Sequence, residues 1–275
     1  TWTETMMRVA APQLDGVSLH YYVHPAGGWP PRAPAVDFDE NGWADALNGA
    51  RKMDELITKH SAIMDKYDPE KRVFLAVDEW GSWYAQDPGT HPGFLRQQNT
   101  LRDALIASIH LDIFAKHADR VRMTAIAQMV NVLQAMIFTE GNKMVLTPTY
   151  HVFEMYKPWQ DATVLPLDIK TPWYNKDQYA MPAVSGSAVK AKDGKIHVGL
   201  SNLDPNQSNT VTIKLDGVNA AAVTGRILTA PAINSHNTFD TPNAVKPEAF
   251  SGATVQGGNL VVTLPAKSVV VLELQ

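Results

Sequence analysis

The stretch Arg72-Val-Phe-Leu-Ala-Val-Asp-Glu-Trp-Gly-Ser-Trp-Tyr84 decides the fold. It starts as an apolar run, residues 73–77, short enough for a strand that is buried on both faces of a parallel sheet. The run ends in two carboxylates, Asp78 and Glu79. Because α/β barrels carry their chemistry at the carboxyl ends of their strands, both are candidate catalytic groups. The alternative is that one of them only caps the turn that follows.

Three aromatic residues, Trp80, Trp83 and Tyr84, come directly after these carboxylates. Flat apolar rings are the surfaces on which sugar rings stack, so they favour a glycosidase carboxylate over a turn cap. Neighbouring residues of a strand point to opposite faces, so only one of Asp78 and Glu79 is expected to enter a barrel mouth. The other is expected to brace the strand end.

Strand-like and helix-like segments alternate in the first part of the chain. Loops rich in glycine and proline, such as residues 25–34, separate them. This order predicts right-handed βαβ units on a parallel sheet. The expected segments are a helix over 3–11 capped by Thr3 or Thr5, a strand over 16–22, a helix over 43–67, a strand over 73–77, a helix over 101–113, a strand over 121–131 and a helix from 147.

Past Pro158 the pattern changes to short segments in which apolar and polar residues alternate. Asp193-Gly194 and Gly257-Gly258-Asn259 are turn sequences of the kind that joins paired strands. We therefore expect an antiparallel β-sandwich over 161–275 after an α/β part over 1–160, with the boundary between Pro158 and Pro172. The expected strands cover residues 187–192, 196–200, 210–215, 223–228, 260–264 and 269–274.

Composition narrows the function classes. The 275 residues carry a formal net charge of -4 and no block rich in Lys and Arg, which argues against nucleic acid as a partner. The absence of cysteine excludes disulfides, thiolate metal sites and cysteine nucleophiles, and leaves the compartment open. No apolar run is long enough for a membrane span, and the histidines show no metal-ligand spacing that repeats.

The α/β part is expected to be incomplete. Three βα units cannot close a barrel or cover both faces of a parallel sheet, so further strands are expected on the N-terminal side. The first residues, 1–7, have no initiator Met at position 1 and look like the interior of a longer chain.

Four motifs, in chain order, carry a resemblance to a known family. They are Gly16-Val-Ser-Leu-His-Tyr-Tyr22, Val77-Asp-Glu-Trp-Gly-Ser-Trp-Tyr84, Ala125-Ile-Ala-Gln-Met-Val-Asn-Val132 and Thr147-Pro-Thr-Tyr-His-Val-Phe-Glu-Met-Tyr156. They resemble glycoside hydrolase family 51, the α-L-arabinofuranosidases. The resemblance implies the C-terminal part of a retaining (β/α)8 TIM barrel, its last three strands, followed by a jelly-roll-like β-sandwich.

The resemblance also implies roles for single residues. Glu79 takes the place of the family's nucleophile, and His20 and Tyr22 that of its active-site His and Tyr after strand six. Gln128 takes the place of the sugar-binding Gln on strand eight, and Trp83 that of a residue in the aromatic wall. The family's acid/base is the Glu of an Asn-Glu pair, and no such dipeptide occurs in this chain, so the acid/base is expected on the missing part.

The implied function is release of terminal arabinofuranosyl units from arabinan, arabinoxylan or arabino-oligosaccharides by a retaining, exo-acting hydrolase without a cofactor. The N-terminal half of the same enzyme is the expected partner, a homo-oligomer the expected assembly, and the chain alone is expected to be inactive. The nearest alternative is another retaining barrel glycosidase, such as a β-xylosidase or an endoglucanase. From a different class, a non-catalytic sugar- or partner-binding module stays open.

Overall fold

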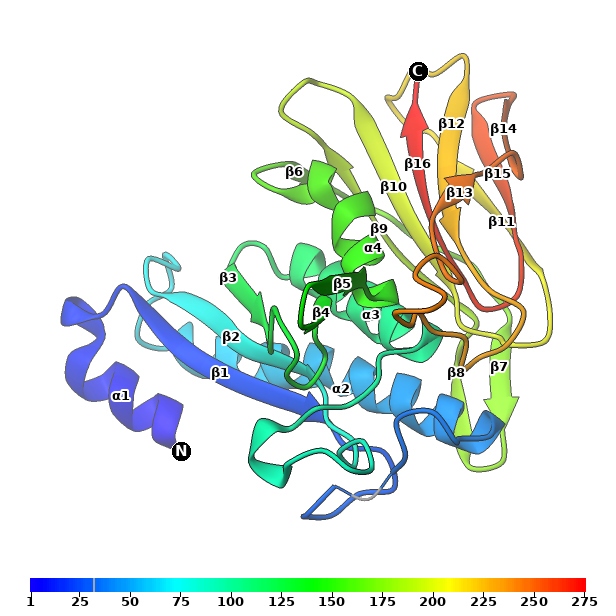
Figure 1. Ribbon diagram of the computed structural model, residues 1–275. Helices are drawn as coiled ribbons and strands as arrows, with labels where there is room; N and C mark the ends of the chain where they lie inside the picture. Colours follow the sequence, from blue (N-terminus) through cyan, green and yellow to red (C-terminus); the bar gives the residue numbers. More distant parts are fainter. Residues whose placement is uncertain (32) are drawn as a thin grey trace.

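The computed structural model describes residues 1–31 and 33–275, which form a parallel sheet, its helices and a β-sandwich (Figure 1). Within these residues the sheet has three strands in the order β1-β2-β3. Its strands are β1 (Gly16–Val23), β2 (Phe74–Ser82) and β3 (Val121–Ile126). The α-helices of the described part are α1 (Trp2–Ala10), α2 (Glu40–Met64), α3 (Leu101–Lys116) and α4 (Pro148–Met155). This is the predicted succession of βα units.

Local capping sets where the helices begin. α1 is capped by the side chain of Thr1, so the prediction of Thr3 or Thr5 as the cap was wrong; both lie inside the helix. The Asp39 side chain caps α2, which therefore begins at Glu40, before the expected start. α3 begins after Thr100, which forms a capping box with the third residue of the helix.

The strand expected over residues 121–131 is shorter than predicted. It ends at Ile126, and the backbone then folds on itself, with the Gln128 N–H donating to the carbonyl of Val132 at 3.1 Å. The amide-rich end of the predicted strand is therefore a loop, in which Met129 and Asn131 bond to Ile137 at the start of β4 and not along β2.

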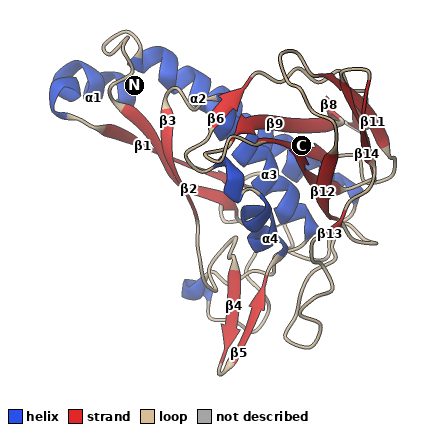
Figure 2. Cartoon of the chain, turned by 90° about the horizontal axis from the view of Figure 1, so that it is seen from above, coloured by secondary structure: helices blue, strands red, loops and turns tan. Residues whose placement is uncertain are grey.

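Two short hairpins are among the elements that the sequence patterns did not predict. The hairpin of β4 (Ile137–Glu140) and β5 (Lys143–Leu146) projects from the body of the molecule in the view from above (Figure 2). The hairpin of β7 (Trp173–Lys176) and β8 (Tyr179–Pro182) lies beside α2, where the Tyr174 hydroxyl donates to Glu40 at 3.1 Å.

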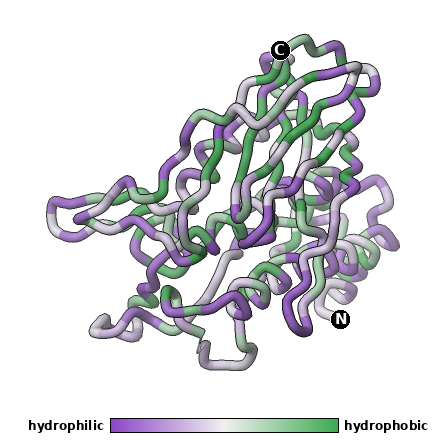
Figure 3. Tube along the Cα trace, turned by 90° about the vertical axis from the view of Figure 1, so that its right-hand side faces the viewer, coloured by the Kyte–Doolittle hydropathy of each residue, from purple (hydrophilic) through white to green (hydrophobic). Residues whose placement is uncertain are grey.

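The β-sandwich pairs a six-stranded sheet, in the order β13-β12-β16-β10-β9-β6, with a three-stranded sheet, β11-β15-β14, among the described residues. Its strands are β6 (Thr163–Leu165), β9 (Val184–Lys190), β10 (Ile196–Asn202), β11 (Asn209–Lys214), β12 (Val223–Leu228), β13 (Glu248–Ala249), β14 (Ala253–Gln256), β15 (Asn259–Leu264) and β16 (Ser268–Leu274). Hydrophobic residues occur along these strands (Figure 3). All the predicted sandwich strands are present; β6, β13 and β14 were not predicted.

Both predicted turns join paired strands of the sandwich. Gly257 and Gly258 alone join β14 to β15, at φ 55° and 75°, a left-handed conformation that glycine adopts without strain. Asp193-Gly194 lies in the turn between β9 and β10, where the Gly194 N–H donates to the Ala191 carbonyl and the Ala191 N–H donates to the Lys195 carbonyl, both at 2.9 Å.

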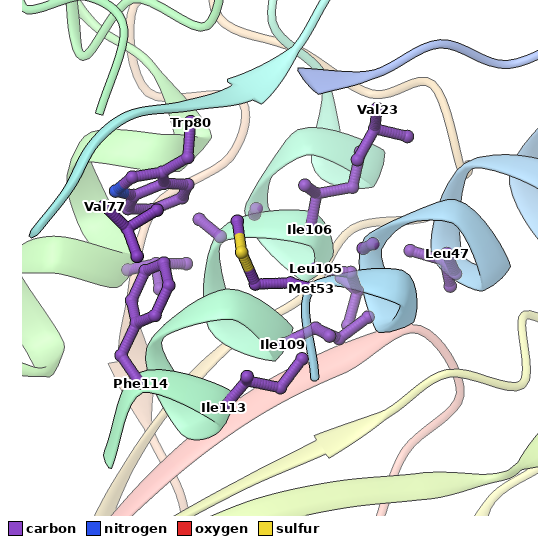
Figure 4. Close-up of a cluster of buried hydrophobic side chains, with 14 of the residues drawn as sticks. Val23, Leu47, Met53, Val77, Trp80, Leu105, Ile106, Ile109, Ile113 and Phe114 are labelled. Carbon is purple, nitrogen blue, oxygen red and sulfur yellow. The ribbon is translucent and has the colours of Figure 1, made fainter. Parts of the chain in front are cut away.

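α3 lies at the centre of the molecule and is buried along almost its whole length. One side of the helix packs against β2, where Val77 and Trp80 meet Phe114 (Figure 4), and other positions contact β9, β10 and β16 of the sandwich. The same apolar cluster contains Leu203 and Val269, so the sandwich shares a core with the helices.

A buried carboxylate adds polar bonds to this shared core. Asp112 of α3 accepts hydrogen bonds from the hydroxyls of Ser187 (2.6 Å) and Ser185 (3.1 Å) on β9, and of Tyr156 (3.1 Å). Burial raises the pKa of Asp112 to about 7, against the opposing effect of these three donors. Both apolar and polar contacts therefore hold the sandwich to the helices.

β1 and β3 each pair with β2 alone among the described residues, so the parallel sheet has two open edges. This matches the prediction of an incomplete α/β part. In the part of the chain that the structure describes, no helix is both long and apolar enough to cross a membrane.

Candidate active site

The carboxyl ends of β1 and β2 meet around a β-bulge. Ser18 pairs with Ala76, but two residues further His20 pairs with Glu79, so β2 holds one extra residue there. The bulge breaks the alternation of side chains, and Asp78 and Glu79 both reach the imidazole of His20. The prediction that these two carboxylates point to opposite faces was therefore wrong.

Two side chains of β1 contact the same carboxylate oxygen of Glu79. The Tyr22 hydroxyl donates to Glu79 Oε2 at 3.0 Å, and His20 Nδ1 lies 3.4 Å from the same oxygen. His20 Nε2 lies 3.3 Å from Asp78 Oδ1, which also accepts from the Ser18 hydroxyl at 2.7 Å. Asp78 is thus braced by the neighbouring strand, as expected, and Glu79 keeps its other oxygen without a hydrogen bond among the described residues.

The group is open to solvent, as a substrate site must be. The side chains of Glu79 and His20 are 44% and 50% exposed. Burial, and to a smaller extent the hydrogen bond to Glu79, raises the pKa of Tyr22 well above its usual value. The phenol therefore stays protonated at neutral pH and remains a hydrogen-bond donor.

An aromatic wall, formed by Tyr22, His24, Trp29 and Trp83, stands beside Glu79. The Trp83 ring lies 5.1 Å from Tyr22, 5.8 Å from His24 and 5.0 Å from Trp29, measured between centroids. Trp29 is 70% exposed at the outer end of the wall. Trp83 was predicted here; His24 and Trp29 were not, although a tryptophan in a glycine- and proline-rich loop is a usable signal.

Two other predicted aromatic residues belong to the core. Trp80 is fully buried and stacks on Phe153 at 5.8 Å, with Phe114 edge-on at 5.3 Å. Tyr84 is also buried, and its hydroxyl donates to Asp103. β2 continues to Ser82, so Trp80 lies within the strand, where its side chain faces the helix layer. The prediction that Trp80 and Tyr84 offer stacking surfaces to a sugar was therefore wrong.

Gln128 lies just past the end of β3, at the same end of the sheet as Glu79. The preceding residue, Ala127, donates its N–H to the carbonyl of Trp80 at 2.9 Å. The Gln128 side chain is exposed and forms no hydrogen bond within the described residues. The structure therefore does not join Gln128 to Glu79 directly, and its sugar-binding role stays a prediction.

A buried polar network, missed by sequence reasoning, fixes the backbone after the bulge. Gln134 Oε1 accepts from the Ser82 N–H, and its Nε2 donates to the Asp103 carbonyl, both at 2.8 Å. The Ser82 hydroxyl donates to the Asp103 carboxylate at 2.6 Å. Gly81 has φ 146°, and a Cβ there would lie 3.1 Å from the Gln134 side chain, so this position requires glycine.

The remaining acidic candidate lies on the projecting hairpin. Glu140 is the exposed last residue of β4. Among residues 1–31 and 33–275, no group of three or more His, Asp or Glu side chains is placed to hold a metal ion.

With this geometry in view, comparison with known proteins decides the family. The sequence signature of the family described as alpha-L-arabinofuranosidase C-terminal domain matches residues 78–268. The chain belongs to this family. It is 45% identical over 276 residues to an intracellular exo-alpha-L-arabinofuranosidase of Bacteroides ovatus, covering 100% of this chain and 53% of that protein. It is 26% identical over 290 residues to an exo-alpha-(1->6)-L-arabinofuranosidase of Bifidobacterium longum, covering 97% and 53%.

Solved structures of family members agree. A GH51 arabinofuranosidase from Xanthomonas axonopodis pv. citri superimposes with a TM-score of 0.98 at 62% identity, over 100% of this chain and 55% of that one. AbfB, a family 51 alpha-L-arabinofuranosidase from Bifidobacterium longum, gives 0.81 at 27% identity over the same shares. The predicted resemblance and fold class are confirmed: this is the C-terminal part of a (β/α)8 barrel followed by a β-sandwich.

The chain spans about half the length of the relatives that it matches, 53% to 55% of those named here. A family 44 endoglucanase from Clostridium acetobutylium shares the fold at a TM-score of 0.62, and its 14% identity carries no further inference.

Proposed function

We propose that this chain forms the nucleophile side of a retaining, exo-acting α-L-arabinofuranosidase that releases terminal arabinofuranosyl units from arabinan, arabinoxylan or arabino-oligosaccharides. The observation that carries the proposal is Glu79, a solvent-accessible carboxylate at a strand end, held at one oxygen by Tyr22 and His20 and faced by the aromatic wall. Membership of the family supports the choice of sugar.

In this mechanism an oxygen of Glu79 attacks the anomeric carbon while the bond to the leaving oxygen breaks. An acid protonates that oxygen. A water molecule, deprotonated by the same group, then displaces Glu79 as a free carboxylate. The tyrosine hydroxyl and the imidazole at Oε2 hold the carboxylate in one orientation, as a nucleophile requires.

The second carboxyl of a retaining glycosidase lies roughly 5 Å from the nucleophile, across the scissile bond. Asp78 does not suit this role, because Oδ1 already accepts from Ser18 at 2.7 Å and the residue adjoins Glu79 on the same strand. Glu140 lies on the projecting hairpin. We propose that the acid/base is on the N-terminal half of the enzyme, which is the partner of this chain.

The proposed activity is tested by assaying the assembled enzyme on three aryl glycosides: an α-L-arabinofuranoside, a β-xyloside and a β-cellobioside. Selective hydrolysis of the arabinofuranoside, with retention of configuration by NMR, is the expected result. Preference for the xyloside or the cellobioside would favour the alternative glycosidases. Tight binding of arabino-oligosaccharide without any turnover would favour a non-catalytic sugar-binding module.

Tyr22→Phe removes one hydroxyl and keeps the ring in the aromatic wall. Loss of a single partly buried hydrogen bond should lower the free energy of unfolding by about 1 kcal/mol. Turnover should fall about tenfold or more, since each 1.4 kcal/mol of transition-state stabilisation corresponds to a factor of ten. Thermal melting and steady-state kinetics on the assembled enzyme measure both. A large fall in Tm with normal turnover would assign Tyr22 to the fold alone.

Trp29→Ala removes the exposed outer end of the aromatic wall. We expect KM for arabino-oligosaccharides to rise about tenfold, as loss of one sugar-stacking ring worth about 1.4 kcal/mol predicts. Trp173→Ala is the matched control, because Trp173 is 61% exposed but lies on the β7–β8 hairpin. Equal KM values for the two variants would remove Trp29 from the sugar site.

We further propose that the barrel part ends near residue 160 and the sandwich begins there. η3 (Lys157–Trp159) ends the helical part, and β6 already belongs to the six-stranded sheet. The shared core around α3 suggests that the two parts unfold together. Assembly of the whole enzyme into a homo-oligomer stays a prediction from the resemblance.

A further inference from the structure

Arg102, in the first turn of α3, is a fully buried cation without an acidic partner. Its side chain is 0% exposed, and no ion pair to it is present among residues 1–31 and 33–275. Its Cζ lies 3.5 Å from the centre of the Phe38 ring and 4.1 Å from that of Tyr84. Nη2 donates to the carbonyls of Pro34 (3.1 Å) and Ala35 (3.3 Å). Two aromatic faces and two carbonyls thus replace the carboxylate that a buried guanidinium usually has.

These contacts belong to the two loops that carry the aromatic wall. Pro34, Ala35 and Phe38 lie in the loop after β1, which also bears Trp29. Tyr84 directly follows Trp83 in the loop after β2. One guanidinium therefore links the end of the loop after β1 and the beginning of the loop after β2 to the rigid start of α3.

The neighbouring residue in the same helical turn holds the second loop from another side. The Asp103 carboxylate accepts from the hydroxyls of Ser82 (2.6 Å) and Tyr84 (3.0 Å). The Ala85 N–H donates directly to the Ala33 carbonyl of the other loop at 2.9 Å, and the Trp83 N–H donates to the carbonyl of Val23, the last residue of β1, at 3.0 Å.

Packing behind the loop after β1 is incomplete. A cavity of about 620 Å³ lies between this loop and the start of α2, and Pro34, Phe38, Asp39 and Arg102 are among its lining residues. Ala33, Ala35 and Val36 of this loop cluster with Tyr84, and Asn234 donates to the Val36 carbonyl at 3.2 Å. The Arg102 contacts add the direct link from this loop to the start of α3.

We propose that Arg102 is a positioning residue that holds Trp29 against Trp83 and so preforms the aromatic wall for the sugar. The inference rests on the proposed glycosidase function. A wall fixed in advance does not lose loop entropy when the sugar binds, so losing the link should weaken binding more than it slows the chemical step at Glu79.

The test uses the whole enzyme with Arg102→Lys and, as a second variant that leaves the arginine in place, Phe38→Leu. Lysine keeps the charge but cannot lie flat between two rings and donate to two carbonyls. We expect KM for arabino-oligosaccharide to rise about tenfold in both variants, with kcat within about twofold of wild type. In Arg102→Ala, added methylguanidinium should restore KM, and it should not change KM of the wild type.

Arg120→Lys is the matched control. Arg120 is also fully buried, but it binds Asp65 and Asp68 at the opposite end of the strands. Its replacement should lower Tm without changing KM. Normal KM in both Arg102→Lys and Phe38→Leu, or an Arg102→Lys variant that only melts earlier like Arg120→Lys, would overturn the inference while the enzyme stays active. An unmodified enzyme without arabinofuranosidase activity would overturn the proposed function as well.

Discussion

Glu79→Gly in the assembled enzyme is expected to lower turnover of an aryl arabinofuranoside by about a thousandfold or more, equivalent to about 4 kcal/mol of transition-state stabilisation. The substitution removes the carboxylate that attacks the anomeric carbon, while Tyr22 and His20 keep their places on β1. Initial rates at saturating substrate measure the effect, and circular dichroism checks that the fold is retained.

A small anion should restore part of this activity, because glycine leaves a space where the carboxylate stood. Azide is expected to attack from the same side and to yield the arabinofuranosyl azide of inverted configuration. Glu79→Gln is the matched control: it also lacks the nucleophile but fills the space, so azide should not rescue it. Unchanged turnover in Glu79→Gly would refute the assignment of the nucleophile.

The part of this site that the sequence predicts is the part fixed by strand ends. A buried apolar run followed by Asp78 and Glu79, beside a second run ending in His20 and Tyr22, is enough to bring the four side chains to one edge. The bulge that turns both carboxylates toward His20 is not predictable from this pattern, because one extra residue in a strand leaves no mark on its composition.

The positions of the aromatic residues were likewise only partly predictable from the sequence. Trp80 and Trp83 have the same side chain, yet one is fully buried in the core and the other lies in the aromatic wall. The difference depends on where β2 ends, which is set by the buried bonds of Ser82 to Gln134 and Asp103, far away in the sequence. Contacts between residues so far apart in the sequence leave no recognisable pattern in the sequence around either residue.

Elements long enough to show a repeating pattern of apolar residues were predictable, and shorter elements were not. α3 repeats apolar residues every four positions, and β11 alternates over its whole length, so both were expected. The β4–β5 and β7–β8 hairpins have strands of four residues each, too short for periodicity to separate them from loops. Their pairing depends on tertiary packing against the rest of the molecule.

The largest remaining prediction concerns the open sheet. β3 has an unpaired edge among the described residues, with Met123 52% exposed, and beside it lies a cavity of about 830 Å³ lined by apolar residues such as Phe114, Phe153 and Trp159. Soluble proteins avoid an uncovered parallel edge of this kind. Further barrel strands and helices would cover it and bring the acid/base carboxyl opposite Glu79.

The 275-residue chain alone is therefore expected to show no hydrolysis of an aryl arabinofuranoside, and to become active when it is mixed or refolded with the N-terminal half. The physical reason is that double displacement requires a second carboxyl about 5 Å from the nucleophile, held to about 0.5 Å by a rigid element. Glu140, at the end of a projecting hairpin, lacks such support. Assays of the chain with and without its partner, and of Glu140→Gln in the mixture, measure this. Hydrolysis by the lone chain that disappears in Glu140→Gln would place the acid/base within these residues and disprove the need for a partner.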